Sequence, residues 1–269
     1  MTELRLESVT YDYPDGTRAL DGVDLLIGSA SSLALVGANG SGKTTLARHL
    51  DGLLRPSHGR VLLDGTDTAD ARVAQLARTV GLCFQQPDRQ VFARTVRDEV
   101  ECGPRHLGAE SEAAFSRAQD ALARVGMTDQ LDSHPGDLGE TRRKLLTVAS
   151  VLAMETPVVV LDEPTTGLDA RGVALVAGLV QELVAEGRTV VGISHDMRFV
   201  ARTFEQLVVL DRGRITLRGS PAEVFAESAW PTLRAAGLEP TEAAVTGARL
   251  GLGSTPTEEV LVEALRGRS

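Results

Sequence analysis

The sequence has 269 residues, a net charge of −9 and ordinary shares of hydrophobic (42%) and charged (24%) residues, which is typical of a soluble globular protein with a large core. Its basic residues are scattered, which argues against a nucleic-acid-binding protein because such a protein needs a basic face. Two cysteines, Cys83 and Cys102, fit neither a disulfide framework nor a metal site. No stretch approaches the roughly 18 apolar residues of a membrane span, and the first residues lack a signal-peptide pattern. We therefore expect a chain that is neither secreted nor membrane-spanning by itself.

The N-terminal segment predicts two strands and a turn. Residues 3–11 alternate between apolar and polar, the turn signal Pro14-Asp15-Gly16 follows, and a second strand is expected at about 23–27. Tyr11 and Tyr13 are the only tyrosines and both precede the turn. They fit two interpretations equally well: a ring on which adenine stacks, or aromatic packing within the sheet.

A phosphate-binding loop is the strongest motif in the chain. The apolar run 33–36 predicts a buried strand, and residues 37–44 then fit G-x-x-x-x-G-K-[ST] without a mismatch. Glycines let backbone N–H groups turn towards an anion, and the helix that follows adds the positive end of its dipole. Lys43 would reach the β- and γ-phosphates, and the Thr44 hydroxyl would ligate Mg²⁺. The predicted nucleotide-binding residues are Gly37, Asn39, Gly40, Ser41, Gly42, Lys43, Thr44 and Thr45.

The chain after this loop alternates between helices and strands. We expect a helix over 44–52, a strand over 60–63, a weak helix over 71–79 and a buried strand over 80–84. Gln85 begins a polar loop at the end of that last strand. A glutamine there can ligate Mg²⁺ or position water, although a polar loop after a strand is more often only solvated.

A helical insertion follows, and after it comes a strand that ends in two acidic residues. Residues 95–153 are helical in composition, and Val158 to Leu161 form an apolar run that ends in two acids. Such a run predicts a parallel strand buried on both faces, whose carboxyl end is where open α/β sheets bind ligands. Beside a phosphate loop, Asp162 would hold Mg²⁺ and Glu163 would orient or deprotonate the attacking water. Without that loop, two acids that cap a strand would be the better interpretation.

The next elements again alternate between helix and strand, and the C-terminal segment does not. We expect a helix over 171–186, a strand over 189–193, a hairpin of strands over 206–210 and 213–217, and short helical pieces over 220–269 broken at 251–256. His195 follows the strand over 189–193, where it could touch a γ-phosphate and sense its loss. A lone histidine is otherwise more often structural.

In this order the motifs resemble those of an ABC-transporter ATPase over essentially the whole chain. The resemblance identifies Walker A (37–44), the Q-loop (Gln85), the Walker B end (161–164), the D-loop (166–169), the switch histidine (His195) and the adenine-stacking aromatic (Tyr13). Within the superfamily the sequence is most similar to ATPases of energy-coupling-factor importers for cobalt, nickel or vitamins. The residues that carry this similarity lie at 11–16, 84–92, 95–96, 103–104, 237–240 and 257–260.

The resemblance implies an α/β P-loop ABC ATPase fold, with a RecA-like core, an antiparallel β subdomain, a helical insertion and a short C-terminal helical appendage. It implies an ATPase domain over 1–225, its helical subdomain at about 95–153, and an appendage over 226–269. The implied cofactors are ATP and Mg²⁺, with Thr44, Gln85 and Asp162 as metal ligands and Lys43, Gln85, Glu163 and His195 as catalytic residues.

The implied function is ATP binding and hydrolysis that powers uptake of a micronutrient, a vitamin or a transition-metal ion, across the cytoplasmic membrane. The implied location of the chain is the cytoplasmic face of that membrane, as a peripheral subunit. The implied partners are a second ATPase subunit, a transmembrane coupling protein and a membrane substrate-binding component. A soluble ABC ATPase acting on nucleic acid or ribosomes is the rival, and it would bring a second cassette, a coiled-coil arm or zinc-binding cysteines. None of these is present in the sequence.

One motif departs from the family. The signature, usually L-S-G-G-Q, aligns with Leu138-Gly139-Glu140-Thr141-Arg142. The serine hydroxyl is missing, and a Glu140 carboxylate about 4 Å from a phosphate would cost on the order of 4 kcal/mol at an effective dielectric near 20. Either a second type of ATPase supplies an intact signature, with this chain as a weakly hydrolytic partner, or a homodimer uses Thr141, Arg142 and the helix N-terminus instead.

Overall fold

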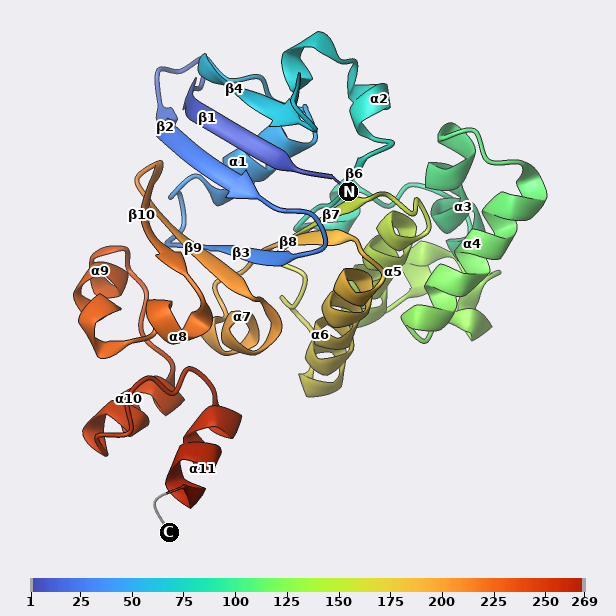
Figure 1. The fold of residues 1–269 in the computed structure, drawn as a ribbon. Helices are drawn as coiled ribbons and strands as arrows, with labels where there is room; N and C mark the ends of the chain where they lie inside the picture. Colours follow the sequence, from blue (N-terminus) through green and yellow to red (C-terminus); the bar gives the residue numbers. More distant parts are fainter. Residues whose placement is uncertain (1, 268–269) are drawn as a thin grey trace.

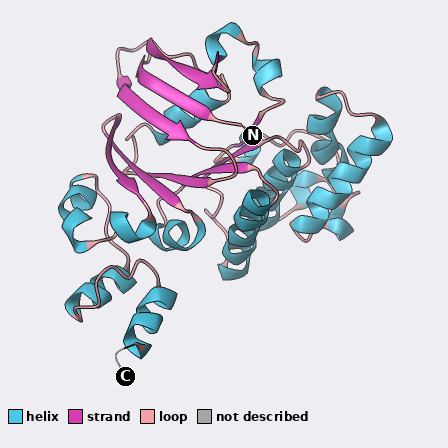
Figure 2. Cartoon of the chain, viewed as in Figure 1, coloured by secondary structure: helices cyan, strands magenta, loops and turns pink. Residues whose placement is uncertain are grey.

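The computed structural model describes residues 2–267 and contains two sheets flanked by helices (Figures 1 and 2). The first sheet is antiparallel, in the order β2-β1-β4-β5. Its strands are β1 (Leu4–Asp12), β2 (Arg18–Ile27), β4 (His58–Leu63) and β5 (Thr66–Asp67). The strand β2 begins five residues earlier than the predicted 23–27 because Asp12 pairs with Arg18 directly across the turn.

The second sheet has the order β10-β9-β3-β8-β7-β6 and is parallel except for β10. Every residue of β3, β7 and β8 is buried, as the unbroken apolar runs predict. The predicted hairpin is formed by β9 and β10 and lies at one edge of the sheet. The strands are β3 (Ser32–Val36), β6 (Val80–Cys83), β7 (Val158–Asp162), β8 (Thr189–Ile193), β9 (Gln206–Asp211) and β10 (Arg214–Gly219).

Two apolar clusters cover the two faces of this sheet. Along β3, Leu33 and Leu35 contribute to one cluster, which the antiparallel sheet and α1 complete. Ala34 and Val36 face the other cluster, which the helical insertion and α6 complete. The sheet is thus buried from both sides, and its strand ends are held at fixed positions.

Helices connect the strands and form the insertion. The connecting helices are α1 (Lys43–Leu50), α2 (Val73–Leu76), α6 (Ala170–Ala185) and α7 (Met197–Thr203), of which α7 was not predicted. The insertion contains α3 (Val96–His106), α4 (Ser111–Arg124) and α5 (Glu140–Leu152). It stands to one side of the sheets in Figure 1, and no strand interrupts it.

The C-terminal segment is helical and contacts the core beside the phosphate loop. It contains α8 (Pro221–Val224), α9 (Trp230–Ala235), α10 (Glu242–Arg249) and α11 (Glu258–Arg266). Arg198 of α7 forms an ion pair with Glu258 of α11 at 2.6 Å. Gly237 lies so close to the loop that a Cβ there would approach the Ala38 side chain to 3.2 Å. The boundary at residue 225 between ATPase domain and appendage stays a prediction.

The buried carboxyl group of Asp51 makes folding stability depend on pH. Burial at the end of α1 raises the pKa of Asp51 from 3.8 to about 6. A raised carboxyl pKa means that the cost of ionisation is present above pH 6 and absent below pH 4. We expect Asp51→Asn, which can still accept the Leu53 N–H, to stabilise the protein at pH 7.5 by up to about 3 kcal/mol.

Urea denaturation of both proteins at pH 7.5 and pH 4 measures this effect. The difference in free energy of unfolding should shrink to near zero at pH 4, where other carboxyl groups titrate equally in both proteins. A difference that does not change with pH would contradict the assignment to Asp51.

Candidate functional site

A cavity of about 400 Å³ lies at the carboxyl ends of the parallel strands, against the antiparallel sheet. Most predicted site residues line it: Tyr13, Asn39, Gly40, Gly42, Lys43, Thr44, Thr45, Gln85, Asp162 and Glu163. Thr17, Arg18 and Ala19 also line it and were not predicted. Gly37, Asn39 and His195 border an adjoining cavity of about 560 Å³, and Ser41 is buried beneath the loop.

The phosphate loop needs glycine where it packs against neighbouring backbone. Gly37 has φ of 153°, and a Cβ there would come within 2.2 Å of the Leu210 carbonyl oxygen. Gly42 has φ of 107°, and its Cβ would lie 2.5 Å from the Ala19 carbonyl oxygen. The loop can therefore sit tightly between β9 and β2 only when both positions lack a side chain.

Lys43 is buried inside the loop that it ends. Its Nζ donates hydrogen bonds to the carbonyl oxygens of Gly37 and Ala38 at 2.8 and 2.9 Å. Burial lowers the pKa of Lys43, and the nearby carboxylates of Glu163 and Asp162 oppose that shift. The loop thus holds one ammonium group at its centre, where an anion would meet it.

Asp162 connects β7 to the phosphate loop. The Thr44 hydroxyl donates to Asp162 Oδ2 at 3.1 Å, across 118 residues of sequence. Asp162 Oδ1 is buried and has no hydrogen-bond partner among residues 2–267, and burial raises the pKa of this carboxyl group. A buried carboxylate oxygen without a partner, next to a hydroxyl group, fits a hard cation such as Mg²⁺.

Glu163 and His195 form a direct contact that the sequence does not reveal. His195 Nδ1 lies 2.8 Å from Glu163 Oε2. Glu163 adopts φ of 49°, which is unusual for a residue other than glycine, and its backbone N–H donates to the Ile193 carbonyl of β8 at 2.9 Å. Strained backbone of this kind is concentrated at functional sites. The histidine side chain stays 68% exposed, and it holds a largely buried carboxylate in place.

The two tyrosines have different surroundings. Tyr13 lines the cavity, and its hydroxyl is hydrogen-bonded to that of Thr45 at 2.9 Å. Tyr11 packs against the apolar cluster below, with its ring edge-on to His49 at 4.9 Å between centroids. Only Tyr13 is therefore placed to meet a base, while Tyr11 packs within the sheet.

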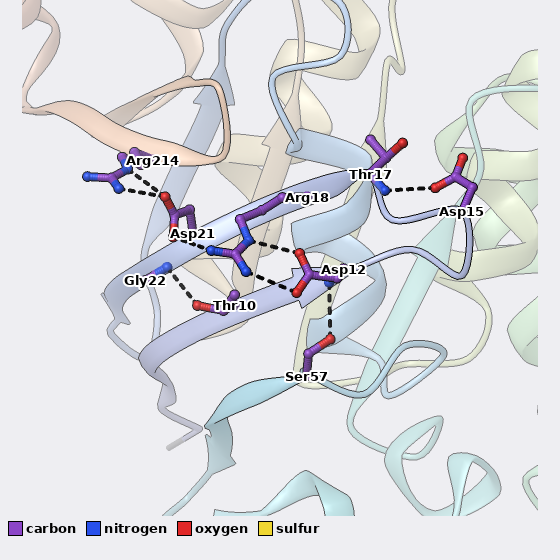
Figure 3. A network of polar contacts seen from close by, with 9 residues as sticks. All are labelled: Thr10, Asp12, Asp15, Thr17, Arg18, Asp21, Gly22, Ser57 and Arg214. Atoms are coloured by element: carbon purple, nitrogen blue, oxygen red, sulfur yellow. Dashed lines mark hydrogen bonds and ion pairs between the residues drawn. The ribbon is translucent and has the colours of Figure 1, made fainter.

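An ion-pair network fixes the turn that carries Tyr13 (Figure 3). Arg18 binds Asp12 through two hydrogen bonds of 2.8 and 3.2 Å and reaches Asp21 at 3.4 Å. Arg214 of β10 binds the same Asp21 at 2.6 Å. The hydrogen bond from Arg18 lowers the pKa of Asp12, so the carboxylate stays ionised. The ends of β1 and β2 are thereby joined to β10 beside the cavity.

Lys144 was not predicted, and it lies behind the site. It is 2% exposed, and its Nζ donates to the carbonyl oxygens of Gln85 at 2.8 Å, Phe84 at 3.3 Å and Asp162 at 3.4 Å. In the sequence it follows two arginines and reads as part of an exposed basic run. Its spacing from Val148 and Val151, four and seven residues on, places it on the buried side of α5, which was the available signal.

The altered signature lies at the start of α5 and contacts a loop of its own chain. The Thr141 hydroxyl donates to the Gly167 carbonyl at 3.3 Å. A Cβ at Gly167 would lie 3.2 Å from Glu140 Oε1, so the carboxylate rests against that glycine. Glu140 remains exposed, and its negative charge stands at the N-terminus of α5.

Comparison with known proteins identifies the family. The family model described as ABC transporter matches residues 20–166. The chain belongs to the ABC transporter family. Residues 37–44 match the Walker A pattern of such proteins, and Asp162 ends a strand that matches their Walker B pattern.

Relatives and solved structures agree with this family. A putative ABC transporter ATP-binding protein of Caldanaerobacter subterraneus is 38% identical over 96% of this chain, which spans 45% of that protein's length. The energy-coupling factor transporter ATP-binding protein EcfA of Methanothermobacter thermautotrophicus is 37% identical over 84% of this chain and 73% of its own length. CbiO1 of Clostridium perfringens, part of an ABC transporter complex, is 35% identical with a TM-score of 0.76 and covers 86% of this chain and 93% of its own.

An ATP-binding cassette solved as a dimer with ADP and phosphate has a TM-score of 0.75 at 25% identity, covering 81% of this chain and 98% of its own. The predicted family and the predicted ABC ATPase fold are confirmed, and proteins of the predicted importer group are among the matches. In the described part of the chain, no helix is long and apolar enough to cross a membrane.

The close packing of Gly42 predicts a stability effect that can be separated from backbone strain. Gly42→Ala would force a Cβ against the Ala19 carbonyl, so we expect a loss of about 2–4 kcal/mol in the free energy of unfolding. Gly40→Ala is the matched control, because Gly40 also has positive φ but a Cβ there meets no atom within 4 Å. It should cost only about 1–2 kcal/mol. Equal losses in urea denaturation of the nucleotide-free proteins would contradict the proposed packing.

Proposed function

We propose that this chain is the ATP-binding and hydrolysing subunit of an energy-coupling-factor-type importer. The observation that carries the proposal is the convergence of Lys43, Thr44, Asp162 and Glu163 on one cavity, while His195 contacts Glu163 from the adjoining cavity. The EcfA relative and the CbiO1 structure support the importer group. The cargo is a micronutrient, either a vitamin or a transition-metal ion.

Each site residue has a role in this proposal. Lys43 and the N–H groups of the loop bind the β- and γ-phosphates, and Tyr13 stacks on adenine. Thr44, Asp162 and Gln85 would hold Mg²⁺, which when bound neutralises charge on the triphosphate. Glu163 accepts a proton from the attacking water or orients it, and His195 fixes the carboxylate and touches the γ-phosphate.

The proposed assembly is a dimer of ATPase subunits on the cytoplasmic face of the membrane. A transmembrane coupling protein and a membrane substrate-binding component complete it. The segment after Gln85 is the proposed coupling surface, and there Phe92 is 75% exposed. ATP would close the dimer and hydrolysis would reopen it, which drives the membrane partner.

A second candidate concerns the nature of the dimer. Gly139 and Glu140 replace the hydroxyl group and the small residue that the family signature uses. The Glu140 carboxylate, which rests against Gly167 at the start of α5, would face the nucleotide of the opposite subunit. This favours a heterodimer in which the other ATPase supplies the intact signature, and this chain completes only a weakly hydrolytic site.

We expect Glu163→Gln to bind ATP but to lower hydrolysis by about 100-fold or more, because the amide cannot accept the proton. Lys43→Ala serves as the contrasting variant, since it should lose binding as well as hydrolysis. ATP binding by calorimetry and phosphate release in the assembled complex measure the two effects. Normal turnover by Glu163→Gln would exclude the role given to this carboxylate.

We expect the chain alone to hydrolyse ATP slowly and Glu140→Gln to raise its rate by about tenfold or more, because one like charge near the triphosphate is removed. Glu112→Gln, on the exposed side of α4, is the control for a general change in charge. Phosphate release is measured at protein concentrations that permit dimerisation. Robust hydrolysis by the unmodified chain alone would remove the need for a second type of ATPase.

A further inference from the structure

We propose that Lys144 is a positioning residue for the magnesium side of the ATP site, where it fixes the backbone of two predicted metal ligands, Gln85 and Asp162. This inference rests on the proposed function. It gives a role to a buried charge that neither the family motifs nor the ligand set includes.

The contacts of Lys144 support this role. Its ammonium group donates to the carbonyl oxygens of Gln85 at 2.8 Å and of Asp162 at 3.4 Å. A third hydrogen bond of 3.3 Å goes to the Phe84 carbonyl at the end of β6. One cation therefore connects the ends of the neighbouring strands β6 and β7, at the residues whose side chains face the cavity.

The position is costly for a lysine, which argues against an incidental placement. The side chain is 2% exposed, and no carboxylate among residues 2–267 forms an ion pair with it. Burial lowers the pKa of Lys144, while the charges of Asp162 and Glu163 act in the opposite direction. A buried ammonium group without an ion-pair partner needs several strong acceptors, and here all of them are backbone carbonyls.

The arrangement also connects the signature helix to the site. Lys144 and Thr141 lie one turn apart on α5, and the Thr141 hydroxyl donates to the Gly167 carbonyl at 3.3 Å. The single helix α5 thus contacts the Q-loop, the Walker B end and the D-loop. A shift of α5 relative to the sheet would move Gln85 with respect to Asp162.

Nucleotide binding tests the proposal in the Glu163→Gln background, where turnover is removed. The affinity for ATP is measured by calorimetry in excess MgCl₂ and again in EDTA. Groups that orient metal ligands typically contribute about 10- to 100-fold to metal affinity, so Lys144→Met should reduce the gain in ATP affinity from Mg²⁺ by about that factor. In EDTA, the ATP affinity of Lys144→Met should stay within about threefold of that of the protein that keeps Lys144, since Lys144 does not touch the phosphate loop. In the Lys144→Met protein, the electron paramagnetic resonance signal of bound Mn²⁺ should be broader or weaker than in the protein that keeps Lys144.

Two further variants separate positioning from general stability. Ser150→Ala removes a buried hydrogen bond on the same helix, from Ser150 Oγ to the Leu146 carbonyl at 3.0 Å, without reaching any loop of the site. Ser150→Ala should leave the gain in ATP affinity from Mg²⁺, here called the magnesium effect, unchanged. Lys144→Gln keeps an amide donor, but its side chain is too short to reach all three carbonyl oxygens. The magnesium effect should therefore fall less in Lys144→Gln than in Lys144→Met.

A wild-type magnesium effect in either folded Lys144 variant would overturn the proposal. An equal loss in Ser150→Ala would overturn it too, because the effect would then follow helix stability. If the Glu163→Gln chain bound no ATP, the proposed function itself would fail, which is distinguishable from failure of the Lys144 role alone.

Discussion

The hydrogen bond between the Thr44 hydroxyl and Asp162 joins the two halves of the site. Thr44 is the second residue of α1, which follows the phosphate loop after β3, and Asp162 ends β7, which is separated from β3 by β8 in the sheet. Parallel strands place all their carboxyl ends at one edge, so residues more than a hundred positions apart meet there. The other site contacts, including the Glu163–His195 pair between β7 and β8, follow from the same edge.

This common edge explains why so much could be predicted from the sequence. Apolar runs that are buried on both faces mark β3, β7 and β8, and the polar residue after each run must lie at the carboxyl end of its strand. The phosphate loop, Asp162 and His195 could therefore be assigned to the same edge of the sheet before any contact was known. The helical insertion was recognisable for the opposite reason, because no such run occurs between 95 and 153.

Contacts that depend on packing between elements could not be predicted in this way. Lys144 looks like a surface charge until α5 is docked onto the ends of β6 and β7. Arg18 lies before the predicted strand over 23–27, and its place in the network with Asp21 and Arg214 requires β2 and β10 to be neighbours. The division between Tyr13 at the cavity and Tyr11 in the core likewise depends on where the first sheet rests on α1.

In the proposed dimer, the helix α5 would contribute to two nucleotide sites of different quality. On the buried side of α5, Lys144 donates a hydrogen bond to the Asp162 carbonyl, next to Glu163, the proposed catalytic carboxylate. The exposed start of the same helix carries Glu140 against Gly167, where a partner's nucleotide would need small, uncharged groups. An intact site on one side and an altered surface on the other do not conflict if they act on different nucleotides. In that proposed dimer, the departure in the signature would affect the partner's site more than the cavity around Lys43.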